Sequence, residues 1–171
     1  MAILARVYPS SNIFRIVIAP SSTPSEIRIT WVFIFGWICT MSGAYIRRNS
    51  YQTLGRMFTF ELSLRKNHRL VTSGPYSVVR HPSYTGASLA LLSALACYTS
   101  PGSWFIECSG LFPPLWKGSI VFSFWFIAGS ICWSAVSSRL KKEDAMLRQQ
   151  FGSQWDAWAA DVPYRLVPGV Y

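Results

Sequence analysis

The sequence predicts an all-α integral membrane protein with about three transmembrane helices, two of which form a helical hairpin. Apolar residues make up 51% of the 171 residues and charged residues only 13%, whereas a soluble domain usually carries about 25% charged residues. The chain also contains long apolar segments without a charge, and a helix needs roughly 20 such residues to cross the hydrocarbon of a bilayer. These observations together exclude an ordinary soluble domain.

Three segments are expected to form the membrane spans. Residues 29–46 and residues 118–138 contain no charged residue. Residues 84–105 form a third candidate, which Pro101 and Gly102 interrupt near its end, because proline removes a helix hydrogen bond. In chain order, residues 84–105 are the second predicted span and residues 118–138 are the third. These two spans form the predicted helical hairpin.

The domain organisation follows from the same segments. We expect one membrane domain at residues 29–171. The preceding residues 1–28 contain Arg6 and Arg15 but no apolar run of the length found at the centre of a signal peptide. We therefore expect an N-terminal segment that is either interfacial or truncated from a longer N-terminus.

The basic residues predict the orientation of the membrane domain. Of the sixteen Lys and Arg residues, seven lie in residues 47–83 and five in residues 139–171, whereas residues 100–117 carry one. Positively charged connections stay in the cytosol, so residues 47–83 and residues 139–171 are expected on the cytosolic side. The net charge of +9 is then explained by topology and by contact with anionic lipid, and not by binding to nucleic acid.

The cysteine and histidine pattern predicts neither a metal site nor a disulfide framework. The four cysteines show no C-x-x-C spacing, and His68 and His81 have no acidic residue close by in the sequence. Structural zinc sites and disulfide frameworks require recognisable spacings of these residues. We therefore expect no metal.

A polar segment stands immediately before the second predicted span. Residues 71–86 are rich in glycine, proline and hydroxyl residues and include Arg80, His81 and Tyr84. Pro82 suits the first turn of a helix, which places these side chains at a cytosolic helix N-terminus, where unpaired amides favour anions. Polar groups at a membrane boundary are costly unless they bind a partner. Taken alone, His81 is more often a capping or turn residue than a functional one.

A second polar cluster follows the third predicted span. If its helix continues beyond the apolar segment, Arg139 and Glu143 share one face at a spacing of four residues, and Gly152 ends the helix. Taken alone, that pair is an ordinary ion pair on a helix surface, and Trp155 and Trp158 are membrane anchors at headgroup level. The topology places both polar clusters on the same side of the membrane, however, and together they predict a pocket between water and lipid.

The two clusters together resemble the isoprenylcysteine carboxyl methyltransferases and, more distantly, the membrane phospholipid methyltransferases. The similarity covers about residues 45–171. It rests on the run His68-Arg-Leu-Val-Thr-Ser-Gly-Pro-Tyr-Ser-Val-Val-Arg-His-Pro-Ser-Tyr-Thr-Gly86, on Arg139-x-x-x-Glu143-Asp144, and on Phe151-Gly-x-x-Trp-x-x-Trp158 with Val162-Pro163.

The resemblance implies a cytosolic pocket for S-adenosylmethionine. Arg139 is expected to be the catalytic residue, which binds the substrate carboxylate, and Glu143 is expected to hold a polar group of the cofactor. The second acidic residue, Asp144, is one methylene shorter than the glutamate that family members often have there, and its role stays open. The remaining expected cofactor contacts are Glu61, His68, Arg69, Leu70, Val71, Tyr76, His81, Pro82, Ser83 and Tyr84.

The expected function is S-adenosylmethionine-dependent methyl transfer to the C-terminal carboxylate of prenylated cysteine in proteins. A carboxylate is already ionised at pH 7, whereas a lipid amine must first lose a proton to a base. Methylation of a phospholipid or another small amphiphile, and an inactive truncated paralogue, are the alternatives. The resemblance implies the endoplasmic reticulum membrane, a cytosolic active site, and prenylated protein C-termini as partners. The preference for farnesyl or geranylgeranyl chains stays open.

Overall fold

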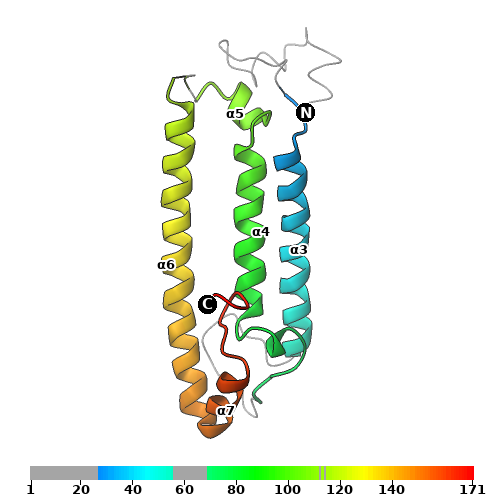
Figure 1. Ribbon diagram of the computed structural model, residues 1–171, viewed down its shortest axis with the longest axis vertical. Coiled ribbons are helices and arrows are strands. Elements are labelled where there is room, and N and C mark those ends of the chain that lie inside the picture. Colours follow the sequence, from blue (N-terminus) through cyan, green and yellow to red (C-terminus); the bar gives the residue numbers. More distant parts are fainter. Residues whose placement is uncertain (1–26, 56–68, 112, 114) are drawn as a thin grey trace. The chain divides into compact units, whose positions relative to one another are not determined.

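The computed structural model describes residues 27–55, 69–111, 113 and 115–171, and all regular elements within them are helical (Figure 1). The all-α prediction is therefore confirmed for the part of the chain that is described. The elements are helix α3 at Trp31–Leu54, the 3-10 helix η3 at Gly74–Ser77, and helices α4 at Pro82–Thr99, α5 at Trp104–Cys108, α6 at Lys117–Phe151 and α7 at Ser153–Asp161.

The chain divides into two compact units. Among the described residues, those within 27–40 and 91–129 form the first unit, and those within 41–90 and 130–171 form the second. Helices α3, α4 and α6 each contribute to both units. The second unit contains both polar clusters that the sequence singles out.

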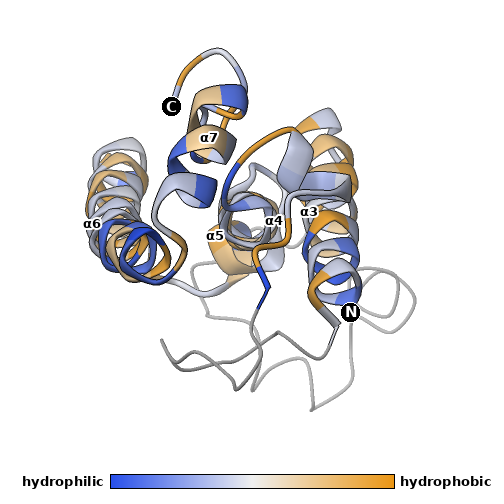
Figure 2. Cartoon of the chain, turned by 90° about the horizontal axis from the view of Figure 1, so that it is seen from below, coloured by the Kyte–Doolittle hydropathy of each residue, from blue (hydrophilic) through white to orange (hydrophobic). Residues whose placement is uncertain are grey.

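Two helical stretches of the described residues, Pro82–Cys108 and Lys117–Phe151, are long and apolar enough to cross a membrane. They contain the second and third predicted spans. Large side chains on α6 are exposed, with Phe122 at 72% and Phe126 at 69%, and Figure 2 shows apolar residues recurring along this helix. Exposed apolar surface of this extent is expected where a helix faces lipid.

Helix α3 contains most of the first predicted span and continues through Arg47 and Arg48 to Leu54. It is long enough to cross a bilayer, but among the described helices only the two stretches above also have the required apolar composition. A third membrane span therefore stays a prediction.

The first unit shows how the end of α4 is built. The helix ends at Thr99, immediately before the turn at Pro101 and Gly102, which confirms the predicted interruption. Gly102 has a φ of +83°, a left-handed conformation that favours glycine. Helix α5 then begins directly after Ser103. The Ser103 Oγ accepts a hydrogen bond from the Ile106 N–H at 3.2 Å, as an N-cap residue does.

In the second unit, α3 and α4 cross at two glycines. A Cβ on Gly43 would lie 2.6 Å from both the Ala90 nitrogen and the Gly86 carbonyl oxygen, and a Cβ on Gly86 would lie 2.6 Å from the Gly43 carbonyl oxygen. Such contacts with backbone atoms leave no room for a side chain at either position, and it is the absence of side chains that allows the two helices to approach so closely. The crossing holds the start of α4 against α3.

The two helix boundaries predicted at the polar clusters are confirmed. Helix α4 begins at Pro82, and α6 continues beyond its apolar segment to Phe151. Gly152 follows with a φ of +51°, and its N–H donates to the Arg148 carbonyl at 2.9 Å. A left-handed glycine after the last turn is a common way for a helix to end.

Candidate functional site

A buried aromatic cluster supports the site in the second unit. Tyr76 of η3 packs with Trp155 and Trp158 of α7 and with Val162, and each of these residues is less than one tenth exposed. The Trp158 indole Nε1–H donates a hydrogen bond to the Tyr76 carbonyl at 3.2 Å. The interpretation of the two tryptophans as membrane anchors is therefore wrong, because both are core residues that fix α7 against η3.

Trp158→Phe should test this anchoring bond. The substitution keeps an aromatic ring but leaves the buried Tyr76 carbonyl without its donor, which costs about 1–3 kcal/mol. We expect a lower midpoint of thermal unfolding for the detergent-solubilised protein, measured by circular dichroism. The matched control is Trp116→Phe, since Trp116 is 60% exposed; an equal loss in both variants would contradict the assignment.

The segment after α7 is hydrogen-bonded to the backbone just before α4. The N–H groups of Arg80 and His81 donate to the carbonyls of Tyr164 and Arg165, each at 2.9 Å. The Arg80 guanidinium also donates to the Pro163 carbonyl at 3.3 Å. The chain near its C-terminus therefore fixes the polar segment that the sequence places at the start of the second span.

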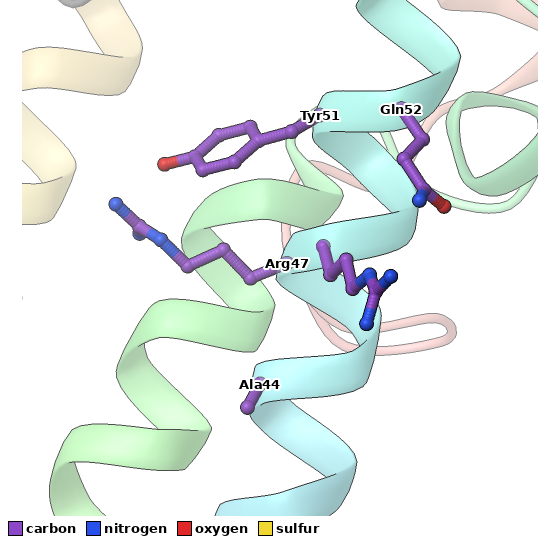
Figure 3. Close-up of a pocket in the computed structure, with 5 residues that line it drawn as sticks. Ala44, Arg47, Tyr51 and Gln52 are labelled. Carbon is purple, nitrogen blue, oxygen red and sulfur yellow. The ribbon is translucent and has the colours of Figure 1, made fainter.

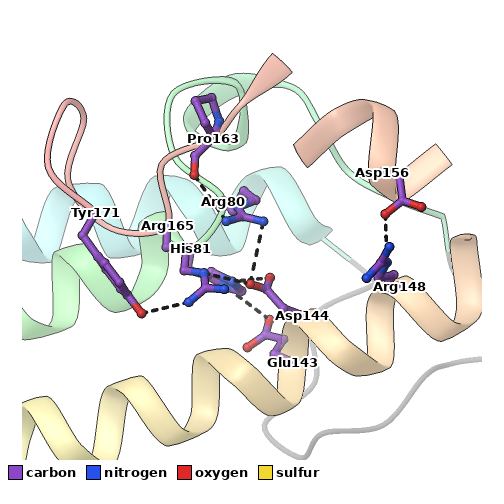
Figure 4. A network of polar contacts seen from close by, with 9 residues as sticks. All are labelled: Arg80, His81, Glu143, Asp144, Arg148, Asp156, Pro163, Arg165 and Tyr171. Atoms are coloured by element: carbon purple, nitrogen blue, oxygen red, sulfur yellow. Dashed lines mark hydrogen bonds and ion pairs between the residues drawn. The ribbon is translucent and has the colours of Figure 1, made fainter. Parts of the chain in front are cut away.

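Asp144 of α6 is the centre of a buried polar network (Figure 4). Its Oδ1 lies 2.8 Å from His81 Nε2, and its Oδ2 lies 3.3 Å from Arg165 Nε and 3.8 Å from Arg80 Nη1. The carboxylate is almost fully buried, as are His81 and Arg80. A buried carboxylate is tolerated only when opposite charges and hydrogen bonds compensate its lost hydration, and three basic side chains provide this compensation.

Glu143, the neighbour of Asp144, lies on the other side of the same imidazole ring. Its Oε1 is 3.9 Å from His81 Nδ1, and its side chain is 28% exposed. The Tyr84 phenol lies close enough to interact with both Glu143 and Arg139. The structure thus joins the two predicted polar clusters through a row of four side chains, which runs from His81 through Glu143 and Tyr84 to the exposed Arg139.

The Tyr76 hydroxyl also belongs to this site. Burial, assisted by the nearby charge of Glu143, raises its pKa well above the ordinary value for tyrosine, because both effects disfavour the phenolate. Tyr76 is therefore a neutral hydrogen-bonding group at any physiological pH.

The other predicted cofactor residues differ in their positions. Leu70 and Val71 pack against the aromatic cluster, whereas Arg69 is exposed. Pro82 and Ser83 form the first turn of α4. Glu61 and His68 lie outside the described residues.

Sequence reasoning missed two members of the network. Arg165 was not proposed, and the role of Asp144 was left open. The contacts of Asp144 with His81 and with Arg165 join residues that are far apart in the chain. His81 and Asp144 are separated by 63 positions. The available signal was the pair of adjacent acidic residues on a helix, which must meet cations once the helix is packed.

A hollow lies on α3 (Figure 3). Its lining residues are Ala44, Arg47, Arg48, Tyr51 and Gln52. The Arg47 guanidinium sits 5.0 Å from the centre of the Tyr51 ring, a distance typical of a cation–π contact. The predicted cofactor residues do not line this hollow, so the predicted cofactor pocket stays a prediction.

Comparison with known proteins finds similarity to one family. Residues 36–109 match the model of the isoprenylcysteine carboxyl methyltransferase (ICMT) family. The chain is 29% identical over 135 residues to protein-S-isoprenylcysteine O-methyltransferase B of Arabidopsis thaliana, an alignment that covers 78% of this chain and 58% of the relative. It is 30% identical over 142 residues to the protein-S-isoprenylcysteine O-methyltransferase of Xenopus laevis, with 82% and 42% covered.

A third relative, the protein-S-isoprenylcysteine O-methyltransferase of Schizosaccharomyces pombe, is 28% identical over 130 residues, which are 75% of this chain and 45% of the relative. The chain spans about half the length of the curated relatives it matches. The matched residues include the whole polar segment before α4, and most of the chain aligns with proteins of one name. The chain is therefore similar to the isoprenylcysteine carboxyl methyltransferase family, through the family model at residues 36–109 and through curated members that align with most of its length.

Proposed function

We propose that this protein transfers a methyl group from S-adenosylmethionine to the C-terminal carboxylate of prenylated cysteine in proteins. The observation that carries the proposal is the exposed Arg139 beside Tyr84 and Glu143. A permanently charged guanidinium binds a carboxylate with two parallel hydrogen bonds. The residues beside this positive charge are of a different kind, because Glu143 offers a carboxylate and Tyr84 an aromatic ring.

The residues beside Arg139 fit the proposed cofactor. S-adenosylmethionine carries a positively charged sulfur, an amino group and ribose hydroxyls, which call for an acceptor and for aromatic surface. Glu143 supplies a partly exposed carboxylate, and the electrostatic influence of Glu143 on Tyr76 and Tyr84 places both rings near it. Aromatic faces attract cations. We assign Glu143 to a polar group of the cofactor, with Tyr76, His81 and Tyr84 around it.

The chemistry requires orientation rather than a base. When bound, S-adenosylmethionine supplies a methyl group activated by its positively charged sulfur. The acceptor carboxylate is already ionised, so this chain would need no base to remove a proton from it and would need only to hold it in line with the methyl group. Arg139 aligns the acceptor and leaves one oxygen lone pair free for attack. Exclusion of water at the membrane boundary strengthens these electrostatic contacts.

The membrane setting supports a prenyl substrate. A prenyl chain is apolar and enters more easily from lipid than from water, and α6 presents exposed apolar side chains such as Phe122 and Phe126 along its membrane segment. We place the active site on the cytosolic side, because twelve of the sixteen basic residues lie in residues 47–83 and 139–171, the segments that contain His81 and Glu143. We assign the protein to the endoplasmic reticulum membrane from family resemblance.

A phospholipid amine is the second candidate acceptor. Its ammonium group must lose a proton before attack, so the site would need a general base. Asp144 is paired with His81, Arg80 and Arg165, and nearby cations make a carboxylate a weaker base. Glu143 lies beside His81 and Arg139. These contacts favour a carboxylate acceptor.

Methyl transfer in membranes that contain this chain tests the proposal. Radiolabelled S-adenosylmethionine is supplied with N-acetyl-farnesylcysteine or phosphatidylethanolamine in parallel reactions. We expect base-labile label on the prenylcysteine, which identifies a carboxyl methyl ester. Label found only in the lipid would move the function to the second candidate. Absence of label from both acceptors, with folded protein present, would refute catalysis by this chain alone and favour a non-catalytic role.

A further inference from the structure

The two adjacent acidic residues of α6 contact opposite nitrogens of one imidazole. Asp144 Oδ1 lies 2.8 Å from His81 Nε2, whereas Glu143 Oε1 lies 3.9 Å from His81 Nδ1. The shorter contact is buried, and the longer one ends at a partly exposed carboxylate. The ring therefore lies between the buried Asp144 carboxylate, to which it is hydrogen-bonded, and the Glu143 carboxylate, which is at ion-pair distance.

From this geometry we propose that Asp144 is a positioning residue that fixes the His81 ring and, through it, the Glu143 carboxylate. This inference rests on the proposed function, since Glu143 is the group assigned to the methyl donor. The second side-chain torsion of histidine, χ2, has two broad minima. An imidazole without a fixed partner can therefore turn from one minimum to the other. A hydrogen bond at one ring nitrogen determines how the other nitrogen is presented.

The partners of Asp144 explain how this carboxylate is itself held. Arg80 and Arg165 approach Oδ2, while His81 approaches Oδ1. Arg80 and His81 are also bonded through their backbone N–H groups to Tyr164 and Arg165. The polar segment before α4, the C-terminal part of α6 and the segment after α7 thus meet at one side chain. Asp144 is thus held by one hydrogen bond at Oδ1 and by two ion pairs at Oδ2.

A positioning role and a purely structural role can be distinguished by the ligands whose binding depends on Asp144. Glu143 and His81 are assigned to the methyl donor, whereas Arg139 is assigned to the prenylcysteine carboxylate. Loss of the Asp144 charge should therefore weaken binding of the methyl donor and leave the affinity for prenylcysteine nearly unchanged. General loosening of the fold would weaken both.

The test compares Asp144→Asn, which keeps the shape but removes the charge, with Asp144→Glu, which restores the charge on a longer side chain. The dissociation constant for S-adenosylhomocysteine is measured by calorimetry on the full chain in nanodiscs. We expect an increase of about tenfold for Asp144→Asn, as for the loss of a carboxylate that orients a ligand-binding histidine, and recovery to within about threefold for Asp144→Glu. The KM for N-acetyl-farnesylcysteine should stay within about twofold of wild type.

The matched control is Asp156→Asn. Asp156 pairs with Arg148 at 2.9 Å, but both side chains are at least half exposed. The same chemical change at a surface pair should leave both binding constants unaltered. Unchanged affinity for S-adenosylhomocysteine in Asp144→Asn would overturn the proposal, as would parallel losses for donor and acceptor.

A second measurement tests the orientation of the ring without relying on catalysis. The chain has two histidines, so His68→Gln leaves His81 as the sole source of imidazole signals in a ¹⁵N-histidine NMR spectrum. The His81 ring N–H should exchange slowly with water when Asp144 is present and rapidly in Asp144→Asn. Persistence of slow exchange in the variant would overturn the positioning role. Absence of donor binding by the wild-type chain would instead refute the proposed function, and this spectrum would then show whether Asp144 holds the ring.

Discussion

Replacing Arg139 with alanine is expected to lower kcat/KM for prenylcysteine by about 10³-fold, equivalent to about 4 kcal/mol. The proposed substrate presents a carboxylate, and Arg139 is the cation assigned to align it beside Tyr84 and Glu143. Without the guanidinium, the acceptor loses both its charge partner and its orientation relative to the methyl group. Methyl-ester formation, measured as base-labile radiolabel, reports the loss.

Binding of the methyl donor should largely survive in Arg139→Ala, because Glu143 and the two tyrosines are unchanged. Calorimetry with S-adenosylhomocysteine separates this result from unfolding. Arg148→Ala is the matched control, since Arg148 is also an exposed arginine of α6 but pairs with Asp156. Retention of wild-type turnover in Arg139→Ala would refute the assigned role.

The helix boundaries near the site could be predicted because they depend on local chemistry. Pro82 starts α4, Gly152 follows α6 with a positive φ, and the turn at Pro101 and Gly102 separates α4 from α5. Proline fixes its own φ and lacks an N–H, and glycine tolerates left-handed conformations. These constraints act within a few residues, so they can be read from a short stretch of sequence.

The internal contacts of the site could not be predicted in the same way. The sequence showed no acid near His81, yet the fold brings Asp144 to 2.8 Å from its ring. The motif pointed to Glu143, whereas the more buried carboxylate is the one next to it. Pairing between residues 63 positions apart depends on how α6 packs against the start of α4, and neither hydrophobic periodicity nor local spacing encodes that rotation.

The tryptophans of α7 illustrate the same limit. Aromatic residues after a membrane span suggest interfacial anchors, but Trp155 and Trp158 are buried against Tyr76. Composition cannot distinguish a ring that faces the headgroups from one that faces a small core. The bond from Trp158 to the Tyr76 carbonyl settles this for the fold described here.

Gly86→Ala should strongly destabilise the close approach of α3 and α4. The added Cβ would lie 2.6 Å from the Gly43 carbonyl oxygen and 2.7 Å from the Arg47 nitrogen. Both are backbone atoms, so relief requires one helix to move rather than a side chain to rotate. Overpacking of this kind costs about 1–3 kcal/mol, which lowers the midpoint of thermal unfolding by about 3–10 °C.

Gly129→Ala provides a control of opposite expected sign. Gly129 lies within α6, and a Cβ there would meet nothing within 4 Å. Alanine is favoured over glycine in a helix by up to about 1 kcal/mol, so this variant should be as stable as wild type or slightly more stable. Because Gly86 follows His81 by little more than one helical turn, a displaced α4 also moves the imidazole away from Asp144, and Gly86→Ala should lose methyl-donor affinity together with stability. Equal thermal midpoints for the two glycine variants would show that the close approach of the two helices is not needed for the fold.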